Sequence, residues 1–413
     1  MISYEEALTI IFANTEALPK TRQRLEKLLD SVLAEPVVAA MDLPSFDNSA
    51  VDGFGVRVAD VEKAASGSPV KLSVKGVIRA GDEGQLRVRE GTACKILTGA
   101  PVPPGVEAVV MKEFCQELNG HVLVAQKARQ GDNIRRRGGE FLRGEAVLPS
   151  GLRITPPVVG LLANLGYSTF AVHRKPRVAV VTTGNELVKP GRRLLPGKIF
   201  DSNSYALKAA VAALGIDDCL TFHAAEDESR TREVLARALA SADVVISAGG
   251  VSVGDYDFVK GALEQLGVRT LLWKIAIKPG KPVYFGTLVD KLRRRRKCVF
   301  GLPGNPVSAL VTFNQFVKPA LAKMMGISAP GAGSVFMVTL KKTIRKKVGR
   351  TEFVRGVLKT ENERLVVEAT AGQDSHMLGG LSLANVLIHF PSDIEQLSQG
   401  EPVLVEFLGW NNF

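Results

Sequence analysis

The chain has 413 residues, 46% of them hydrophobic and 23% charged, which is typical of a folded protein of about three domains. No apolar run reaches the roughly 18–20 residues that cross a bilayer, and the acidic start MISYEE does not resemble a secretory leader. Four scattered cysteines and five histidines argue against a zinc or disulfide framework, so a reducing cytoplasm is the expected location.

The net charge of +11 fits nucleic acid, anionic lipid or anionic small molecules as partners. The densest basic stretch, KLRRRRK at 291–297, lies between two apolar runs and is predicted to be the solvated tip of a hairpin. Nucleic-acid binding through Arg293 to Arg296 is an alternative, but no aromatic side chains interleave there to stack on bases. The surplus charge suits a small anionic substrate at least as well.

The first 175 residues divide into a helical or linker part and a β-rich part. Ser3 and Glu6 have the spacing of a capping box, which predicts a helix. Apolar residues at 25, 28, 29, 32 and 33 have helical spacing and predict a second helix, ended by Pro36. Short β-branched runs between turns predict a β-rich domain at 45–145, while 1–44 and 146–175, with a short helix at 158–165, form an N-terminal and linker domain.

The second half reads as an α/β domain followed by a small β domain. At 176–326, apolar strands alternate with helical segments, which predicts a three-layer α/β domain with a mainly parallel sheet. The predicted strands are 178–181, 219–224, 244–247 and 299–302. The predicted helices are 204–214, 230–240, 258–266 and one that begins at 306. Residues 331–413 return to short strands with charged turns and are predicted to form a small β-barrel or sandwich.

Three loops follow strands of the predicted sheet: TTGNE (182–186), AGGVSVGDYD (248–257) and LPGNPVS (302–308). Ligands of open parallel sheets bind beyond the carboxyl ends of the strands. Glycines in the second loop let backbone amides approach an anion, and the following helix would present free N–H groups. In the third, Asn305 can cap a helix, Pro306 suits its first position, and Val307 and Ser308 would supply exposed amides and a hydroxyl. One glycine loop merely turns the chain, but three on one edge favour an anion site.

Lysines and arginines elsewhere could add positive charge to such a site. Lys274 and Lys278 are evenly spaced, so on an extended strand both would point to the same face, and Lys281 follows a Pro-Gly turn. Solvated lysines are the alternative. In the β-rich part, the loop with Arg135 and Arg137 suits an oxyanion, although a solvated charge run explains it equally.

Read together, these stretches resemble the molybdenum insertase family of the MoeA type over essentially the whole chain. The segments that carry the resemblance are PSFDNSAVDG (44–53), TGAPVP (98–103), RRRG (135–138), TGNEL (183–187), DSNS (201–204), SAGGVSVGDYD (247–257), KPGKP (278–282) and GLPGNPVS (301–308). Eight such segments in one order are highly specific. Val51 replaces the family's usual Met, and Gly139-Glu140 stands where Glu-Asp is common, which leaves the role of Glu140 open.

The resemblance implies a molybdopterin-binding fold for the central domain. It also implies an elongated homodimer, whose active cleft lies between the central domain of one subunit and the β-rich domain of the other. Matching motif positions imply catalytic roles for Asp52, Thr98, Glu186, Asp227, Asp257, Lys274 and Lys278. Substrate contacts are expected from Lys198, Gly249, Gly250, Ser252, Gly254, Lys281, Pro303, Gly304, Asn305, Pro306, Ser308, Arg135 and Arg137.

The implied reaction combines adenylylated molybdopterin with molybdate and yields molybdenum cofactor and AMP. We expect the loop from Gly249 to Gly254, with Lys278 and Lys281, to hold the pterin phosphate and pyrophosphate. Molybdate is expected near Lys198, Ser252 and Ser308. Acids in a cationic site suit Mg²⁺, with Asp227 and Asp257 as metal or water-positioning residues and Glu186 in support.

Two other functions remain open on the same central fold. One is a molybdopterin adenylyltransferase, which would consume ATP, and the other is a non-catalytic scaffold that acts through protein partners. No Ser-His-Asp arrangement is evident, so a covalent intermediate is not expected. The pterin adenylyltransferase and molybdoenzyme chaperones are further expected partners, whereas nucleic acid and membrane are not.

Overall fold

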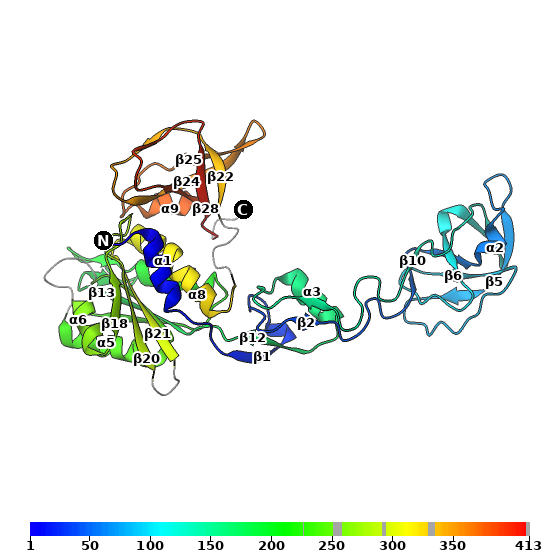
Figure 1. Cartoon of the computed structure of the whole chain (residues 1–413), viewed down its shortest axis with the longest axis horizontal. Coiled ribbons are helices and arrows are strands. Elements are labelled where there is room, and N and C mark those ends of the chain that lie inside the picture. Colours follow the sequence, from blue (N-terminus) through cyan, green and yellow to red (C-terminus); the bar gives the residue numbers. More distant parts are fainter. Residues whose placement is uncertain (226, 251–257, 291–294, 329–334, 410–413) are drawn as a thin grey trace. The chain divides into compact units, whose positions relative to one another are not determined.

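The computed structural model describes residues 1–225, 227–250, 258–290, 295–328 and 335–409 (Figure 1). Its contacts divide the chain into two compact units. Unit 1 comprises residues 1–35, 151–159 and 169–413, and unit 2 comprises residues 36–150 and 160–168. In the part of the chain that the structure describes, no helix is long and apolar enough to cross a membrane.

A six-stranded sheet forms the centre of unit 1. Its order is β16 (Cys219–Ala224), β13 (Val178–Thr183), β17 (Val244–Ala248), β21 (Arg295–Leu302), β20 (Tyr284–Asp290) and β18 (Arg269–Trp273). The first four strands are parallel, β20 runs antiparallel to them, and β18, which pairs antiparallel with β20, forms the edge. The predicted mainly parallel sheet is therefore confirmed.

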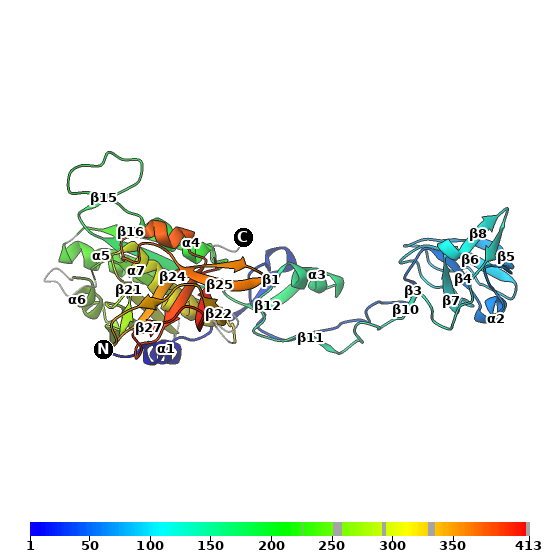
Figure 2. The same cartoon turned by 90° about the horizontal axis from the view of Figure 1, so that it is seen from above.

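Helices cover both faces of this sheet, which makes three layers (Figure 2). Alternate residues of β13 separate the two cores: Val178 and Val180 pack with one helix group, and Ala179 and Val181 with the other. The first group consists of α1 (Tyr4–Ala13), α4 (Asn203–Ala212), α7 (Pro306–Thr312), a π-helical turn (Phe313–Val317) and α8 (Lys318–Met324). The second consists of α5 (Glu228–Ser241) and α6 (Phe258–Gln265).

The capping box that begins α1 is confirmed. The Ser3 hydroxyl accepts a hydrogen bond from the Glu6 amide at 3.1 Å, and the Ser3 amide donates to the Glu6 carboxylate at 2.8 Å. Ala7 and Ile11 lie one turn apart and are completely buried in the core beneath the sheet. This spacing gives the short helix the apolar face that tertiary packing requires.

The C-terminal part of unit 1 is a closed barrel, which confirms the predicted β-barrel. Five strands follow one another around it: β24 (Thr351–Glu361), β25 (Arg364–Ala369), β22 (Val335–Leu340), β28 (Pro402–Phe407) and β26 (Val386–Phe390), which pairs back with β24. The short strand β19 (Ile277–Lys278) runs parallel to the start of β24 and joins the barrel to the α/β part. The other elements here are β23 (Ile344–Arg345), β27 (Gln396–Leu397) and α9 (Leu378–Leu383).

Unit 2 is β-rich, as the sequence predicts. Its sheet has the order β7 (Ala108–Met111), β4 (Gly53–Val56), β6 (Thr92–Ile96), β5 (Val70–Ile78), β9 (His121–Val124) and β8 (Cys115–Leu118). Two short ladders pair β2 (Val37–Val38) with β11 (Ala146–Leu148), and β3 (Asn48–Ser49) with β10 (Ile134–Arg135). The remaining elements of the chain are β1 (Lys20–Arg24), β12 (Thr169–His173), β14 (Leu187–Val188), β15 (Ile199–Phe200), α2 (Val58–Val61), α3 (Pro156–Asn164), and two 3₁₀ turns, Leu25–Lys27 and Lys112–Phe114.

The predicted second helix at residues 25–36 is wrong. Only a 3₁₀ turn forms there, and Asp30 has a left-handed φ of 61°. Val32 and Leu33 instead make β-bridges to Arg153 and Val172. Leu28, Val32 and Leu33 are buried without a helix, because extended backbone bridges bury apolar side chains equally well, whereas Leu29 is 50% exposed.

The basic stretch at 291–297 is only partly a hairpin tip. Strands β20 and β21 pair antiparallel, with Asp290 opposite Arg295, which confirms a hairpin, while 291–294 lie outside the described residues. Lys297, however, is 8% exposed, and its ammonium donates to the Leu239 carbonyl. The expectation of a fully solvated run is therefore wrong at Lys297, because the strand continues through the charged residues.

We predict that Phe300→Ala lowers the free energy of unfolding of the α/β part by about 3–5 kcal/mol. Phe300 is completely buried in β21, and its ring centroid lies 4.9 Å from that of Phe285. Leu220→Ala, on edge strand β16 and 42% exposed, is the control and should change it by about 0.5 kcal/mol or less. Urea unfolding followed by tryptophan fluorescence measures both, and equal losses would contradict this description of the core.

Candidate functional site

The carboxyl ends of three parallel strands lie at one level, which brings their loops together. Thr182 in β13, Ala248 in β17 and Leu302 in β21 are in register across the sheet. The Gly249 amide donates to the Leu302 carbonyl at 3.1 Å. The neighbouring Gly304 is so close that a Cβ there would lie 3.6 Å from the Gly249 Cα. The structure thus places the second and third glycine loops in contact.

Gly249 and Gly250 have no room for a side chain. Their φ values are +95° and +65°, in the left-handed region that favours glycine. A Cβ on either would lie 2.9 or 3.0 Å from the Thr183 hydroxyl oxygen at the end of β13. The backbone of the second loop therefore packs against the Thr183 side chain of the first loop. Both glycines are needed for this close approach.

Lys198 and the segment before α4 also reach these loops. The Lys198 ammonium donates to the Asn185 carbonyl at 2.7 Å. The Asn203 side-chain amide donates to the Gly304 carbonyl at 2.6 Å. The other end of that side chain, Asn203 Oδ1, is buried and has no hydrogen-bond partner among the described residues. An acceptor left unpaired beside the Gly304 loop is suited to a ligand that donates a hydrogen bond.

Asp227 and Glu186 follow neighbouring strands, since Ala224 of β16 is paired with Thr183 of β13. Asp227 is the N-cap of α5: its Oδ1 accepts from the Ser229 hydroxyl at 2.6 Å and from the Arg230 amide at 2.9 Å. These two hydrogen bonds, the Ser229 one being the stronger influence, lower the pKa of Asp227, so the carboxylate stays ionised.

Carboxylate oxygens are the ligands that Mg²⁺ prefers, and Glu186 and Asp227 supply them from adjacent strand ends. No three His, Cys, Asp or Glu side chains gather closely enough to hold a metal within the described residues. Asp257, the other acid expected to bind Mg²⁺, lies outside those residues, as do Ser252 and Gly254. Mg²⁺ commonly binds through one or two carboxylates plus substrate phosphates, so the donors present fit that mode.

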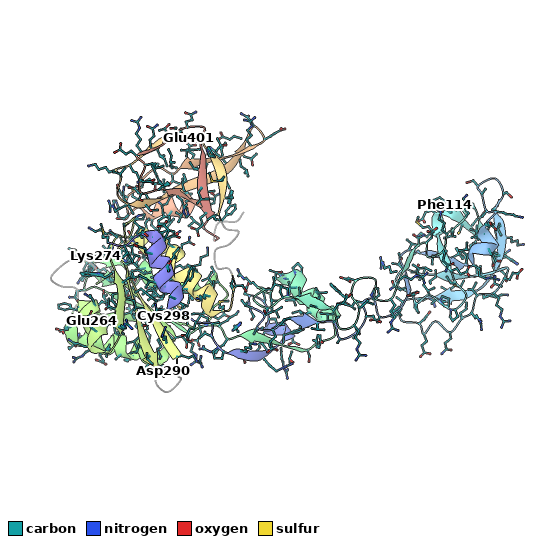
Figure 3. All side chains as sticks on the ribbon, in the orientation of Figure 1. Phe114, Glu264, Lys274, Asp290, Cys298 and Glu401 are labelled. Atoms are coloured by element: carbon teal, nitrogen blue, oxygen red, sulfur yellow. The ribbon has the colours of Figure 1, made fainter. Side chains whose placement is uncertain are left out.

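The parity argument for Lys274 and Lys278 is wrong. Lys274 has a left-handed φ of 68° and separates β18 from β19, so no single extended strand carries both lysines. Its ammonium lies 3.9 Å from the centroid of the Trp273 ring, a cation–π contact. Figure 3 shows Lys274 at the end of the sheet opposite Asp290, which is also the end where the parallel strands finish.

Lys278 contacts the barrel. Its ammonium lies 3.2 and 3.3 Å from the two carboxylate oxygens of Glu352, a residue of β24. Lys281 is exposed, and its carbonyl accepts from the Ile275 amide at 3.0 Å. The barrel therefore supplies a counter-charge to the predicted cation cluster, which no sequence pattern indicated.

A barrel loop covers the start of α7. Asn305 and Pro306 occupy the N-cap and first helical positions as predicted, but the Asn305 side chain makes no capping bond. It donates to the Ser375 hydroxyl at 3.0 Å, and the Val307 amide donates to the Ser375 carbonyl at 3.2 Å. Ser308 is only 3% exposed. The expectation of exposed amides and an exposed hydroxyl at Val307 and Ser308 is wrong, because the loop around Ser375 lies over them.

Arg355 is a candidate that sequence reasoning missed. It is completely buried in β24, and its Nη2 donates to the carbonyls of Gly372 at 2.7 Å and Asp374 at 3.3 Å. Its Nε and Nη1 have no partners among the described residues, and burial lowers the pKa of the guanidinium. Strand alternation offered one signal, because Arg355 lies on the same face of β24 as Phe353, which is buried against the α/β part. Unpaired donors next to the Ser375 loop suit an oxyanion.

Unit 2 brings Asp52 and Thr98 together. Asp52 Oδ1 accepts from the Thr98 amide at 2.9 Å and from its hydroxyl at 2.7 Å, and these bonds, with the Lys112 charge, lower the pKa of Asp52. The arginine loop is largely engaged by protein acids. Arg136 Nη1 and the Arg137 amide bind Asp47, and Arg137 Nε binds Asp42 at 2.6 Å. Arg135 lies in β10, opposite Asn48 and exposed.

A cavity of about 320 Å³ lies beside edge strand β16. Its lining mixes polar and apolar side chains, includes Lys189 and Lys208, and takes Asp201 and Ser204 from the DSNS segment. The lining residues are Lys189, Asp201, Ser204, Tyr205, Lys208, Thr221, Phe222 and His223. Both Asp201 oxygens are engaged, by the Ser204 amide and the Thr182 hydroxyl, so this carboxylate helps to shape the wall.

Family comparison matches three successive regions: the MoeA N-terminal region (domain I and II) at residues 2–166, a probable molybdopterin binding domain at 179–323, and the MoeA C-terminal region (domain IV) at 337–408. The molybdopterin molybdenumtransferase of Haemophilus influenzae is 36% identical over 384 residues, which are 92% of each chain. That of Bacillus subtilis is 34% identical over 385 residues, 92% of this chain and 88% of the relative.

A solved structure covers the chain from end to end. The crystal structure of the molybdopterin biosynthesis MoeA protein from Pyrococcus horikoshii OT3 is similar with a TM-score of 0.81 and 30% identity, over 98% of this chain and 100% of that one. The resemblance drawn from the motifs is thereby confirmed. The chain belongs to the MoeA family of molybdopterin molybdenumtransferases, enzymes of molybdenum cofactor biosynthesis.

Proposed function

We propose that this enzyme inserts molybdate into adenylylated molybdopterin and releases AMP. The observation that supports this most directly is the edge of the central sheet, where Gly249, Gly304, Asn203 and Lys198 converge beside the barrel donors. Two anionic reactants must be held there side by side, which requires amide donors and cations together. The net charge of +11 also favours the arrival of both reactants from solution.

The two anions suit different parts of this edge. The left-handed backbone at Gly249 and Gly250, with Lys278 and Lys281, suits the phosphate groups of the pterin nucleotide. Molybdate suits the half-buried Lys198 better than Ser308, which is buried. Ser252 remains a proposed molybdate contact on the basis of the family resemblance.

The chemistry can be balanced without a covalent enzyme intermediate. Two sulfurs of the pterin dithiol replace two molybdate oxygens, which leave as two waters with the two thiol protons and two protons from solvent. One further water is consumed when the phosphoanhydride to AMP is cleaved. The loops exclude bulk water and hold the anions, so positive charge and donors stabilise the charge that develops on the departing AMP. Bound Mg²⁺, held by Glu186, Asp227 and Asp257, would neutralise pyrophosphate charge.

We further propose a homodimer in which Asp52 and Thr98 of one chain serve the α/β site of the other. The first support is the family resemblance. The second is Asp52, whose carboxylate accepts two hydrogen bonds from Thr98 while its side chain remains 42% exposed. A carboxylate held rigidly at a surface is suited to a substrate presented by another molecule. The pterin adenylyltransferase and molybdoenzyme chaperones are proposed as transient partners.

The test of the reaction uses purified enzyme, adenylylated molybdopterin, molybdate and Mg²⁺, with AMP measured by chromatography. We expect AMP release that requires molybdate and proceeds without ATP. Release that requires ATP, or ATP turnover itself, would favour the adenylyltransferase. A protein that binds the pterin nucleotide yet never releases AMP would favour the scaffold.

We predict that Lys278→Ala raises the KM for molybdate or pterin nucleotide about tenfold or more, because a charge-assisted contact is lost. Thermal stability should change little, since the half-exposed pair with Glu352 contributes only about 0–1 kcal/mol. Lys342→Ala is the matched control: it too pairs with a barrel glutamate, Glu368, and should keep the wild-type KM. Identical steady-state constants for Lys278→Ala and wild type would remove Lys278 from the site.

We predict that two impaired variants, Asp52→Asn and Lys278→Ala, regain activity at substrate concentrations below the KM when their chains are mixed in one dimer. If each site combines residues from two chains, half of the sites in a mixed dimer are wild type, so dimers purified through both tags regain about half of the wild-type rate. Differently tagged chains, co-expressed and purified through both tags, provide the measurement. No recovery in verified mixed dimers would show that both residues act within one chain.

A further inference from the structure

A buried polar network joins the barrel to the helices below the sheet. Glu406, on β28 of the barrel, accepts hydrogen bonds from Gln315 Nε2 at 2.6 Å and Asn314 Nδ2 at 2.9 Å. His389 Nε2 of β26 lies 3.3 Å from the same carboxylate. Glu406 is 8% exposed, and Asn314 and Gln315 are 2% exposed. Such a network fixes geometry when every member has a partner.

The network extends at both ends. Tyr4 of α1 donates its hydroxyl to Gln315 Oε1 at 2.7 Å, and the Lys318 ammonium donates to Asn314 Oδ1 at 3.1 Å. Burial alone would raise the pKa of Glu406, but hydrogen bonds from His389 and Gln315, with the charges of His389 and Lys318, hold it below its usual value. The carboxylate therefore stays ionised inside the interface, and Lys318 balances its charge.

The helical partners sit at a π-helical turn, Phe313–Val317, between α7 and α8. Neighbouring residues of an α-helix point about 100° apart, so Asn314 and Gln315 would not ordinarily serve one carboxylate. Wider turns of this kind occur frequently at functional sites. The helix α7, which continues into this π-helical turn, begins at Pro306 in the site loop. Its orientation therefore sets where Asn305 and the Val307 amide lie.

On the barrel side, the network contacts β24, the strand that carries Glu352 and Arg355. Phe353 of β24 packs edge-on against the rings of Tyr4, at 5.2 Å, and His389, at 5.1 Å. Its neighbours on β24 are Glu352, the partner of Lys278, and Arg355 with its unpaired nitrogens. Both surfaces of the anion site, the α7 loop and β24, are thus attached to one buried carboxylate.

We propose that Glu406 is a positioning residue, which sets the barrel against α7 so that Lys278 and the Asn305–Ser375 contact form one anion-binding surface. The inference rests on the proposed function for its kinetic part only. Glu406 touches neither reactant and acts through Gln315 and Asn314.

The test replaces the carboxylate by an amide. Glu406→Gln replaces an acceptor oxygen by an NH₂ donor that faces the donors of Asn314 and Gln315. The barrel should therefore shift relative to α7 by a fraction of an ångström or more. We expect kcat/KM for molybdate to fall on the order of 10–100-fold, mainly through KM. Hydrogen exchange should become faster in the segments 303–311 and 371–377, which meet through the Val307–Ser375 hydrogen bond.

Two controls separate positioning from stability. Glu368→Gln removes a barrel carboxylate that pairs with Lys341 and Lys342 away from α7, and should leave both readouts unchanged. Val367→Ala opens the barrel core at a completely buried position and lowers thermal stability by another route. When Val367→Ala and Glu406→Gln are equally destabilised, Val367→Ala should leave hydrogen exchange in the segment 303–311 unchanged.

If Glu406→Gln folds poorly, a double variant that swaps the carboxylate and the amide between positions 406 and 315 provides the test. The double variant Glu406→Gln with Gln315→Glu keeps one negative charge and the hydrogen bond from Tyr4, and should recover much of the wild-type KM and exchange. The proposal is overturned if Glu406→Gln keeps wild-type exchange in both segments, or if Val367→Ala reproduces its full effect. Failure of the wild-type enzyme to release AMP would reject the proposed reaction and leave the exchange result to decide on Glu406.

Discussion

The site depends on a backbone approach at the carboxyl edge of the sheet. Because β13, β17 and β21 are parallel and in register, the chain leaves each strand at the same height. Gly249 can then lie against Thr183 on one side and Gly304 on the other without any side chain between them. Such contact leaves amides and carbonyls at the surface of the edge, and these groups act on charged ligands without needing to reorganise. The cations are arranged around this backbone frame.

Charge at this edge is balanced within the protein before any ligand binds. Lys278 faces Glu352, Lys198 faces the Asn185 carbonyl, and Lys274 lies over Trp273. Two nitrogens of Arg355 are buried without partners among the described residues, and so is one nitrogen of Arg295 on β21. An arginine kept in this state carries a desolvation cost that an entering oxyanion would relieve. The barrel is therefore part of the site, since it supplies both Glu352 and Arg355.

Sequence predicted the layers and the loops well, because both depend on local patterns. Continuous apolar runs identified the buried strands, and the Ser3–Glu6 spacing identified α1. Prediction failed where distant segments decide the outcome. The left-handed backbone at Lys274 has no local signal, and the covering of Val307 by the Ser375 loop comes from 68 positions further along the chain. Likewise, the apolar spacing at 25–33 could not distinguish burial by bridges from burial by a helix.

The α/β part of unit 1 is completed by residues from outside its own stretch of sequence. The Ala276 amide donates to the Ile2 carbonyl at 2.9 Å, and Ala7 and Ile11 of α1 are completely buried beside β13 and β17. A fragment that starts at residue 176 would therefore expose the apolar surface that α1 covers. It would also lose Tyr4, and with it one end of the chain of hydrogen bonds to the barrel. The molybdopterin-binding domain of this enzyme is therefore completed by α1, and excising it for study would change the surface under investigation.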